Sequence, residues 1–263
     1  MEKIKGAVLL YGITRDQGKI VSESFRSTIL NLFKNNNIEC DIYIHAWILD
    51  SKISSYIKEE NDLEIKNQDD WKLFNPDFFK TEKQSDFDES INYKTYIDNS
   101  GLDYGQDNDQ KIINYVRALF SLQKCYAMTN NKNYNFFFVA RLDTVFKTNE
   151  GLVNSISCAH KSKAPLIHTP CWHHWGGLND RMCIANLQGV ELYCNRINQL
   201  KNYKKINPNH KISINSKPFN SEKFLFNLVS SCKIQHECFN AKSTRIRVDG
   251  SSPHFDRKLI NNI

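Results

Sequence analysis

Apolar positions in the first fifty residues change from one spacing to another and predict a strand, a helix and a second strand. Lys5 to Thr14 opens with an apolar run typical of a strand. Apolar residues at the three-to-four-residue period of a helix come next, at Phe25, Ile29, Leu32 and Phe33. Asp41 to Trp47 then predicts another strand. Two strands joined through a helix favour a parallel sheet with a right-handed crossover.

The strongest apolar run lies near the middle of the chain and ends in two charges. Phe136 to Ala140 are consecutive apolar residues, which predicts a parallel strand buried on both faces. A helical pattern over 109–128 precedes it. Arg141 and Asp143 follow, and the two-residue period of a strand aims both at one side. Ligands bind at this edge of an open α/β sheet, so the pair suggests a phosphate and a metal.

The remaining pattern predicts one α/β domain over residues 1–263, an α/β/α sandwich with a mostly parallel central sheet. Strands are expected at 164–169, 181–185 and within 233–248, and helices at 189–200 and 221–232, the latter capped by Ser221. Residues 50–108 are polar with weak periodicity, which predicts an irregular insertion. The tail after residue 251 is expected to be poorly structured.

Composition narrows the class of protein. The formal charge of +6 would favour an anionic ligand but is too small and dispersed to indicate nucleic acid, so no nucleic-acid partner is expected. The apolar run from Ala7 to Tyr11 is too short for a secretory core or a membrane span. The 8 cysteines are scattered singly, with no C-x-x-C pair, and are interpreted as reduced, mostly buried thiols of a cytoplasmic protein.

A second segment rich in candidate chemistry lies between two predicted strands, at His173-His174-Trp175-Gly176-Gly177-Leu178-Asn179-Asp180-Arg181. The paired glycines allow positive φ and close approach of a ligand. Trp175 offers a face for a sugar ring, and Asp180 supplies a carboxylate. Such a loop suits both binding and catalysis.

These two segments resemble motifs of the GT-A class of nucleotide-sugar glycosyltransferases. Arg141-Leu142-Asp143 stands where that class has an acidic D-x-D motif after the central strand, and Trp175 to Asp180 resembles its later W-G-G-x-[ND]-[DE] loop. The R-x-D form with a following G-x-N-D-R loop is similar to glycosyltransferases of large DNA viruses and of bacterial polysaccharide clusters. The order of elements agrees over roughly residues 5 to 235, and only the two motifs are specific.

The resemblance implies a Rossmann-like fold and a reaction between a nucleoside-diphosphate sugar and a glycan or other hydroxyl acceptor. It implies Asp143 as ligand of Mn²⁺ or Mg²⁺, with His254 as a further candidate ligand. Arg141 replaces the first acid of the motif and is a candidate hydrogen-bond donor to the diphosphate. The other candidate donor-binding residues are Tyr11, Gly12, Arg15 and Arg117.

Asp180 matches the position of the carboxylate that accepts the acceptor's proton in inverting members of the class. An ordinary turn aspartate paired with Arg181 is the competing interpretation. The candidate acceptor-binding residues are His173, His174, Trp175, Gly176, Gly177 and Asn179. Glu222 is also a candidate base, although an acid in the first turn of a helix already has a dipole reason to be there.

The principal alternative is a non-catalytic module, either a degenerate transferase that holds a nucleotide or glycan or a weakly basic nucleic-acid binder. Arg141 in place of the first acid favours this alternative, whereas the intact Trp175 to Asp180 loop opposes it. The sugar, the nucleotide, the acceptor, the stereochemistry and the oligomeric state are not set by the sequence.

Overall fold

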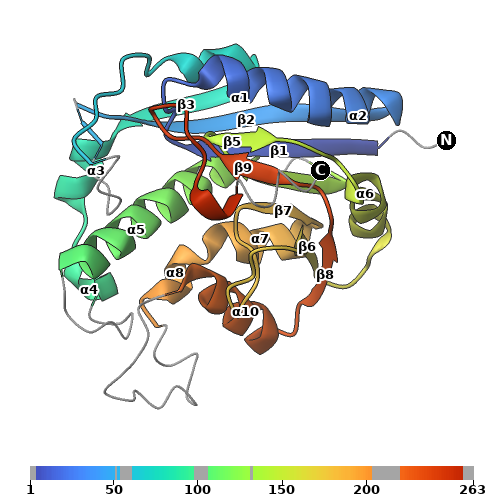
Figure 1. Cartoon of the computed structure of the whole chain (residues 1–263). Coiled ribbons are helices and arrows are strands. Elements are labelled where there is room, and N and C mark those ends of the chain that lie inside the picture. Colours follow the sequence, from blue (N-terminus) through green and yellow to red (C-terminus); the bar gives the residue numbers. More distant parts are fainter. Residues whose placement is uncertain are drawn as a thin grey trace.

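The computed structural model describes residues 4–50, 52–53, 61–97, 106–130, 133–202 and 220–256 (Figure 1). A seven-stranded sheet in the order β3-β2-β1-β4-β7-β6-β8 forms its centre. These strands are β1 (Ile4–Gly12), β2 (Ile38–Ile48), β3 (Phe78–Lys83), β4 (Phe136–Arg141), β6 (Leu166–Pro170), β7 (Met182–Ala185) and β8 (Gln235–Phe239). All neighbours are parallel except β7, which is antiparallel to β4 and β6. The predicted α/β class with a mostly parallel central sheet is confirmed.

The strand β4 is buried on both faces, as its apolar run predicts. Phe136 and Phe138 meet Phe33 edge-on on one face of the sheet. On the opposite face, Phe137 packs against the rings of Tyr126 and Tyr134. Alternate side chains of one strand therefore contribute to two different apolar cores.

Helices cover both faces of the sheet (Figure 1). One face is covered by α1 (Gly18–Phe25), the π turn η1 (Arg26–Leu30), α2 (Asn31–Asn35) and α6 (Leu152–Lys161). The other carries α5 (Gln106–Ala127), α7 (Leu187–Asn195), α8 (Ile197–Leu200) and α10 (Ser221–Ser231). The predicted N-cap of α10, Ser221, is wrong by one residue. The N-cap is Asn220, whose side-chain oxygen accepts a hydrogen bond from the Lys223 amide at 2.7 Å.

The polar segment expected to be irregular contains regular structure in its described part. It holds η2 (Asp70–Phe74), β3, α3 (Gln84–Ser90) and α4 (Lys94–Ile97). The strand β3 lies at the edge of the sheet and its side chains are mostly exposed, with Phe79 57% exposed. An edge strand without a buried face leaves no alternation in the sequence, which explains why the pattern missed it.

A small second sheet pairs β5 (Thr144–Phe146) with β9 (Ser243–Arg245) in antiparallel register. This pairing brings the C-terminal part of the chain next to the end of β4. Beyond it, Asp256 is fully buried and accepts a hydrogen bond from Thr244 at 3.1 Å. Residues 252–256 of the tail expected to be poorly structured thus pack on the domain, and 257–263 lie outside the described residues.

The expectation that every cysteine is reduced is wrong for one pair. Cys171 and Cys238 form a disulfide across the ends of the parallel neighbours β6 and β8. The partners are 67 residues apart in sequence, so only the pairing of the strands reveals them. Among the free cysteines, Cys158 and Cys232 are exposed. Within the described residues, no helix is both long and apolar enough to cross a membrane.

Candidate active site

A cavity of about 670 Å³ lies where β1, β2 and β4 end. Tyr11 and Gly12 enter it from β1, Trp47 from β2, Arg141 from the end of β4, and Asp143 from the turn that follows β4. Because β7 runs antiparallel to β4, with Met182 opposite Ala140, the start of β7 lies at the same edge. The loop between β6 and β7 therefore reaches the cavity as well.

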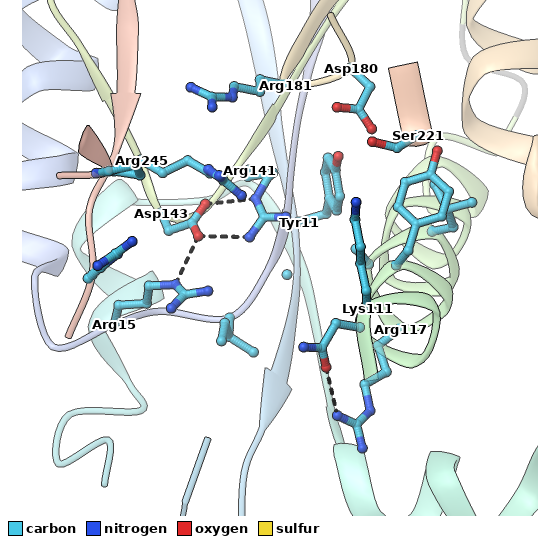
Figure 2. Close-up of a pocket in the computed structure, with 18 of the residues that line it drawn as sticks. Tyr11, Arg15, Lys111, Arg117, Arg141, Asp143, Asp180, Arg181, Ser221 and Arg245 are labelled. Atoms are coloured by element: carbon cyan, nitrogen blue, oxygen red, sulfur yellow. Dashed lines mark hydrogen bonds and ion pairs between the residues drawn. The ribbon is translucent and has the colours of Figure 1, made fainter. Parts of the chain in front are cut away.

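Positive charge predominates in the cavity wall. In the part of the chain that the structure describes, the wall has four acids, Asp143, Asp180, Glu222 and Asp256, and nine basic side chains, Arg15, Lys111, Arg117, Arg141, Arg181, Arg196, Lys223, Arg245 and Arg247. Figure 2 shows Arg15, Arg141 and Arg245 around Asp143, with Asp180 and Ser221 across the cavity beyond Tyr11. This distribution favours a ligand that carries several negative charges.

Asp143 lies at the centre of the arginine cluster. Arg141 donates to both of its carboxylate oxygens, from Nε and Nη2, at 2.8 Å each. Arg15 donates from Nε to Oδ2 at 2.9 Å. Burial alone would raise the pKa of Asp143, but the charge and hydrogen bonds of Arg141, aided by Arg15 and Arg245, hold it well below its usual range. The carboxylate is ionised and fixes two guanidinium groups at the cavity wall.

Two further arginines approach the cluster from β9. The register places Arg245 opposite Thr144, directly after Asp143, and Arg247 follows two residues later. The buried Nε atoms of Arg245 and Arg247 have no hydrogen-bond acceptor among the described residues. Asp256 fixes this segment, because its carboxylate accepts from the Arg245 amide at 3.2 Å and from Arg181 at 2.7 Å. An anion in the cavity would supply the missing acceptors.

The predicted metal ligands do not fit a divalent cation. Both oxygens of Asp143 already accept guanidinium N–H groups, and a dication beside them would meet the charges of Arg15 and Arg141 at close range. Within the described ranges, Asp143 belongs to no group of three metal-donor side chains. His254 is exposed and is not part of the cavity wall. We therefore derive no step through a metal at Asp143.

The loop after β6 docks on the first turn of α10. The Leu178 amide donates to the carbonyl of Glu222 at 2.9 Å. A Cβ atom on Gly177 would stand 2.1 Å from that same carbonyl group, so only glycine permits the contact. Asn179 is buried. Its side chain donates a hydrogen bond to the Trp172 carbonyl and accepts one from the Arg181 amide, and these two bonds fix the shape of the loop.

This docking places Asp180 and Glu222 on one side of the cavity. Both are half-buried and line it, and Ser221 donates to Glu222 Oε2 at 3.1 Å. Burial and then the charge of Asp180 raise the pKa of Glu222 to about 7. Among the described residues, the Asp180 carboxylate makes no hydrogen bond or ion pair, since Arg181 pairs with Asp256 instead. The competing interpretation of Asp180 as the partner of Arg181 is therefore not supported.

The residues predicted to bind the sugar donor all reach the cavity, but they differ in what they contact. Tyr11, Gly12, Arg15, Arg141 and Asp143 line it at the strand ends. Arg117 lines it too, yet its guanidinium is occupied by Asp88 at 2.6 and 2.9 Å and by Asn114 at 3.1 Å. Its contacts join α5 to α3, which indicates a structural role.

Only part of the candidate acceptor segment faces the cavity. Trp175, which is 46% exposed, and Asp180 line it. The other members do not, and they shape the loop instead: His173, His174, Gly176, Gly177 and Asn179. His173 lies 3.4 Å from Asp256, with its ring against Trp172 and Trp175. Its contacts are thus within the loop and the C-terminal segment.

Several cavity residues were missed by the sequence analysis. Arg245 and Arg247 are two positions apart in a predicted β-rich segment, and that alternation is a signal that could have identified them. Arg196, which is buried, donates to the Tyr193 carbonyl at 2.6 Å and lies 4.1 Å from the centre of that ring. No local pattern marks Arg196, because its place in the cavity depends on how α7 and α8 pack.

Comparisons with known proteins give fold likeness only. No protein-family model and no curated protein sequence matches the chain. Mouse xyloside xylosyltransferase 1 is similar over 91% of this chain and 85% of its own, with 8% identity and a TM-score of 0.46. A protein of Desulfovibrio desulfuricans G20, described as a nucleotide-diphospho-sugar transferase, is similar over 90% and 80%, with 6% identity and a TM-score of 0.36. Such low identities and TM-scores say nothing about the reaction of this chain.

Proposed function

We propose that the protein is a glycosyltransferase that moves a sugar from a nucleoside-diphosphate sugar to a hydroxyl acceptor, such as one on a glycan. One observation carries the proposal. On one wall of a single cavity, two arginine Nε atoms have no acceptor among the described residues, and on another wall lies a carboxyl pair whose member Glu222 has a pKa of about 7. The first wall suits an anionic leaving group and the second suits a proton acceptor.

The donor diphosphate would bind at the arginine wall. Arg245 and Arg247 have Nε donors without acceptors among the described residues, and Arg15 and Arg141 are fixed beside them by Asp143. Guanidinium groups bind phosphate oxygens in paired hydrogen bonds. They would stabilise the negative charge that develops on the diphosphate as the bond from its oxygen to the anomeric carbon breaks. In this proposal the arginines supply the positive charge for which the sequence predicted a divalent metal.

The nucleoside would occupy the apolar end of the cavity. Ile13, Trp47, Leu49 and Ile53 line that end. The Trp47 side chain is held by a hydrogen bond from its indole N–H to the Arg117 carbonyl at 3.0 Å. The ring is almost fully buried against His45 and Phe87, so the aliphatic side chains beside it provide the apolar surface for a base.

Proton transfer would involve Glu222 and Asp180 together. As the acceptor oxygen bonds to the anomeric carbon, its proton passes to the Glu222 carboxylate, and the negative charge of Asp180 keeps that carboxylate basic. A base with a pKa near the working pH is partly ionised and still holds a transferred proton well. Trp175 lies beside this pair in the cavity wall, where its exposed ring would support an acceptor sugar.

A donor panel tests the proposal. UDP-, GDP-, dTDP- and CMP-sugars are incubated with the protein, alone and with simple glycan acceptors, and nucleotide release is measured for wild type, Glu222→Gln and Glu191→Gln. Glu191 is an exposed acid of α7 and serves as the matched control. We expect release from at least one donor, reduced in E222Q and unchanged in E191Q.

Two other results would change the conclusion. Binding of a nucleoside diphosphate, seen as a raised melting temperature, without release from any donor would indicate the non-catalytic module. A raised melting temperature with a nucleic acid and with none of the nucleotides would indicate the nucleic-acid binder.

A further inference from the structure

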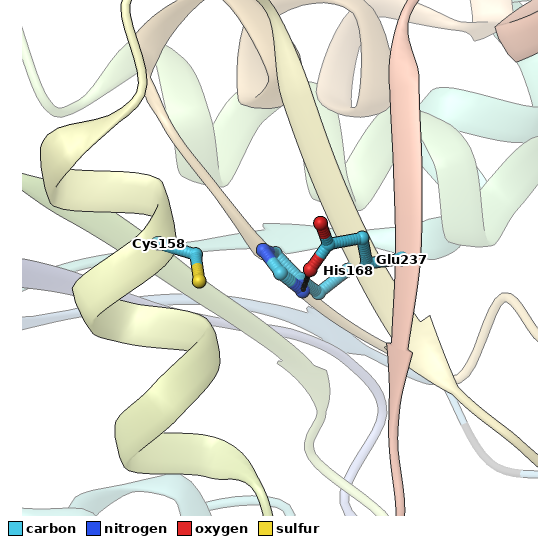
Figure 3. Close-up of side chains that lie close together, drawn as sticks. All are labelled: Cys158, His168 and Glu237. Carbon is cyan, nitrogen blue, oxygen red and sulfur yellow. Dashed lines mark ion pairs between the residues drawn. The ribbon is translucent and has the colours of Figure 1, made fainter.

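Three side chains with metal-binding chemistry lie together away from the catalytic cavity. They are Cys158 of α6, His168 of β6 and Glu237 of β8, and their ligand atoms all lie within 4.8 Å of one another (Figure 3). None of the three lines the cavity. Their place follows from the fold, because β6 and β8 pair with His168 opposite Glu237, and α6 covers this face.

His168 is a buried polar side chain with no hydrogen bond. It is 1% exposed, and neither ring nitrogen has a hydrogen-bond partner among the described residues. Its Nδ1 lies 3.6 Å from Glu237 Oε2, which is too long for a hydrogen bond. A buried donor or acceptor without a partner destabilises the fold. This unsatisfied ring is the second observation that points to a ligand.

We propose that Cys158, His168 and Glu237 bind a Zn²⁺ ion. Thiolate sulfur, imidazole nitrogen and carboxylate oxygen are the ligands that zinc takes in proteins, at about 2.0–2.3 Å. Two ligands at such distances in a tetrahedral site stand about 3.4 Å apart, close to the 3.6 Å between His168 and Glu237. Cys158 and Glu237 are exposed, so small side-chain rotations can complete the site and water can take the fourth position.

Charge and protonation agree with this ion. One thiolate and one carboxylate balance the two charges of Zn²⁺, and the imidazole binds as a neutral ligand. On binding, the Cys158 thiol gives its proton to the buffer as the S–Zn bond forms.

The ion would join α6 to the edge of the sheet. The strand β8 is the outermost on this side and leads through residues 240–242 into β9, which carries Arg245. The disulfide of Cys171 and Cys238 is separate from the site, because Thr169 and Cys171 point to the face opposite His168 along β6. The two links would together hold the edge strand on both of its faces.

Calorimetric and thermal titrations with Zn²⁺ alone test the site, with protein prepared under nitrogen and without reductant so that the disulfide is kept. We expect one Zn²⁺ per chain, release of about one proton and a higher melting temperature. Cys158→Ser and Glu237→Gln should each weaken Zn²⁺ binding at least tenfold. Both positions are exposed, so the folding of these variants is not in question.

Cys232→Ser is the matched control, because Cys232 is the other exposed free cysteine and lies on α10's C-terminal side. It should bind Zn²⁺ as the wild type does. Absence of Zn²⁺ binding in the wild type would overturn the site. So would equal binding in C158S and wild type, or a loss of binding in C232S alone.

Discussion

Replacement of Glu222 by glutamine should remove activity and at the same time stabilise the fold. Loss of a general base lowers the rate by about 10²- to 10⁴-fold, which is about 3–5 kcal/mol in the barrier. The glutamine side chain keeps an oxygen that can accept from Ser221, so the local hydrogen bond found in the structure is preserved. The loss would therefore report on the charge of the carboxylate.

The stability gain follows from the raised pKa of Glu222. The pKa rises from an unfolded value of 4.5 to about 7, so the folded state binds more protons than the unfolded state between these pH values. Stability consequently falls as pH rises through this window, and above pH 7 the full penalty is present. A shift of this size corresponds to at most about 3 kcal/mol, and partial exposure of the group reduces it to about 1–2 kcal/mol.

The assay compares wild type, E222Q and the control E191Q at pH 8. In E222Q we expect donor turnover to fall at least 100-fold and the melting temperature to rise by about 2–8 °C. Wild-type activity should rise with pH through about 7 as Glu222 ionises. Asp180→Asn should move this rise in activity to lower pH, because it leaves burial but removes the neighbouring charge that also raises the pKa of Glu222. Full activity in E222Q would show that Glu222 is not the base, and a lower melting temperature than wild type at pH 8 would show that its ionised carboxylate does not destabilise the fold.

Three further changes test the structure around the cavity. Asp143→Asn should lower stability by about 2–4 kcal/mol and abolish activity whether or not Mn²⁺ is added, because it removes a buried carboxylate that balances two half-buried guanidinium groups; rescue by Mn²⁺ would contradict this. Gly177→Ala should lower the melting temperature in thermal denaturation, since its Cβ would overlap the backbone of α10 by more than a small shift can relieve. Reduction of the Cys171–Cys238 disulfide should cost about 2–4 kcal/mol in denaturant unfolding, and alkylation of the unreduced, unfolded chain should modify six thiols.

The parts of the fold that the sequence predicted are those set by local patterns. The run Phe136 to Ala140 is buried on both sides of β4, and the helical period over 109–128 corresponds to α5. Arg141 and Asp143 were expected to point to one side and do contact each other. In each case the signal lies within a few residues, so no knowledge of distant contacts is needed.

The parts that it missed depend on contacts between distant segments. Glu222 was named as a candidate base, but its place beside Asp180 could not be predicted, because it depends on the loop before β7 docking on α10. Arg245 reaches Asp143 through the pairing of β9 with β5, about 100 residues away in sequence. The expected metal at Asp143 was inferred from a motif position, whereas the arginines that occupy its oxygens come from two separate strand ends.

We expect the arginine wall to bind a nucleoside diphosphate without a divalent metal. Thermal titration of the protein with UDP, GDP, dTDP and CDP in the presence of EDTA measures this directly. At least one nucleotide should raise the melting temperature of wild type and of Lys161→Ala, an exposed control on α6, but not of the double variant Arg245→Ala, Arg247→Ala. No shift with any nucleotide, or a shift that requires Mn²⁺, would show that the arginines do not bind the diphosphate in this way.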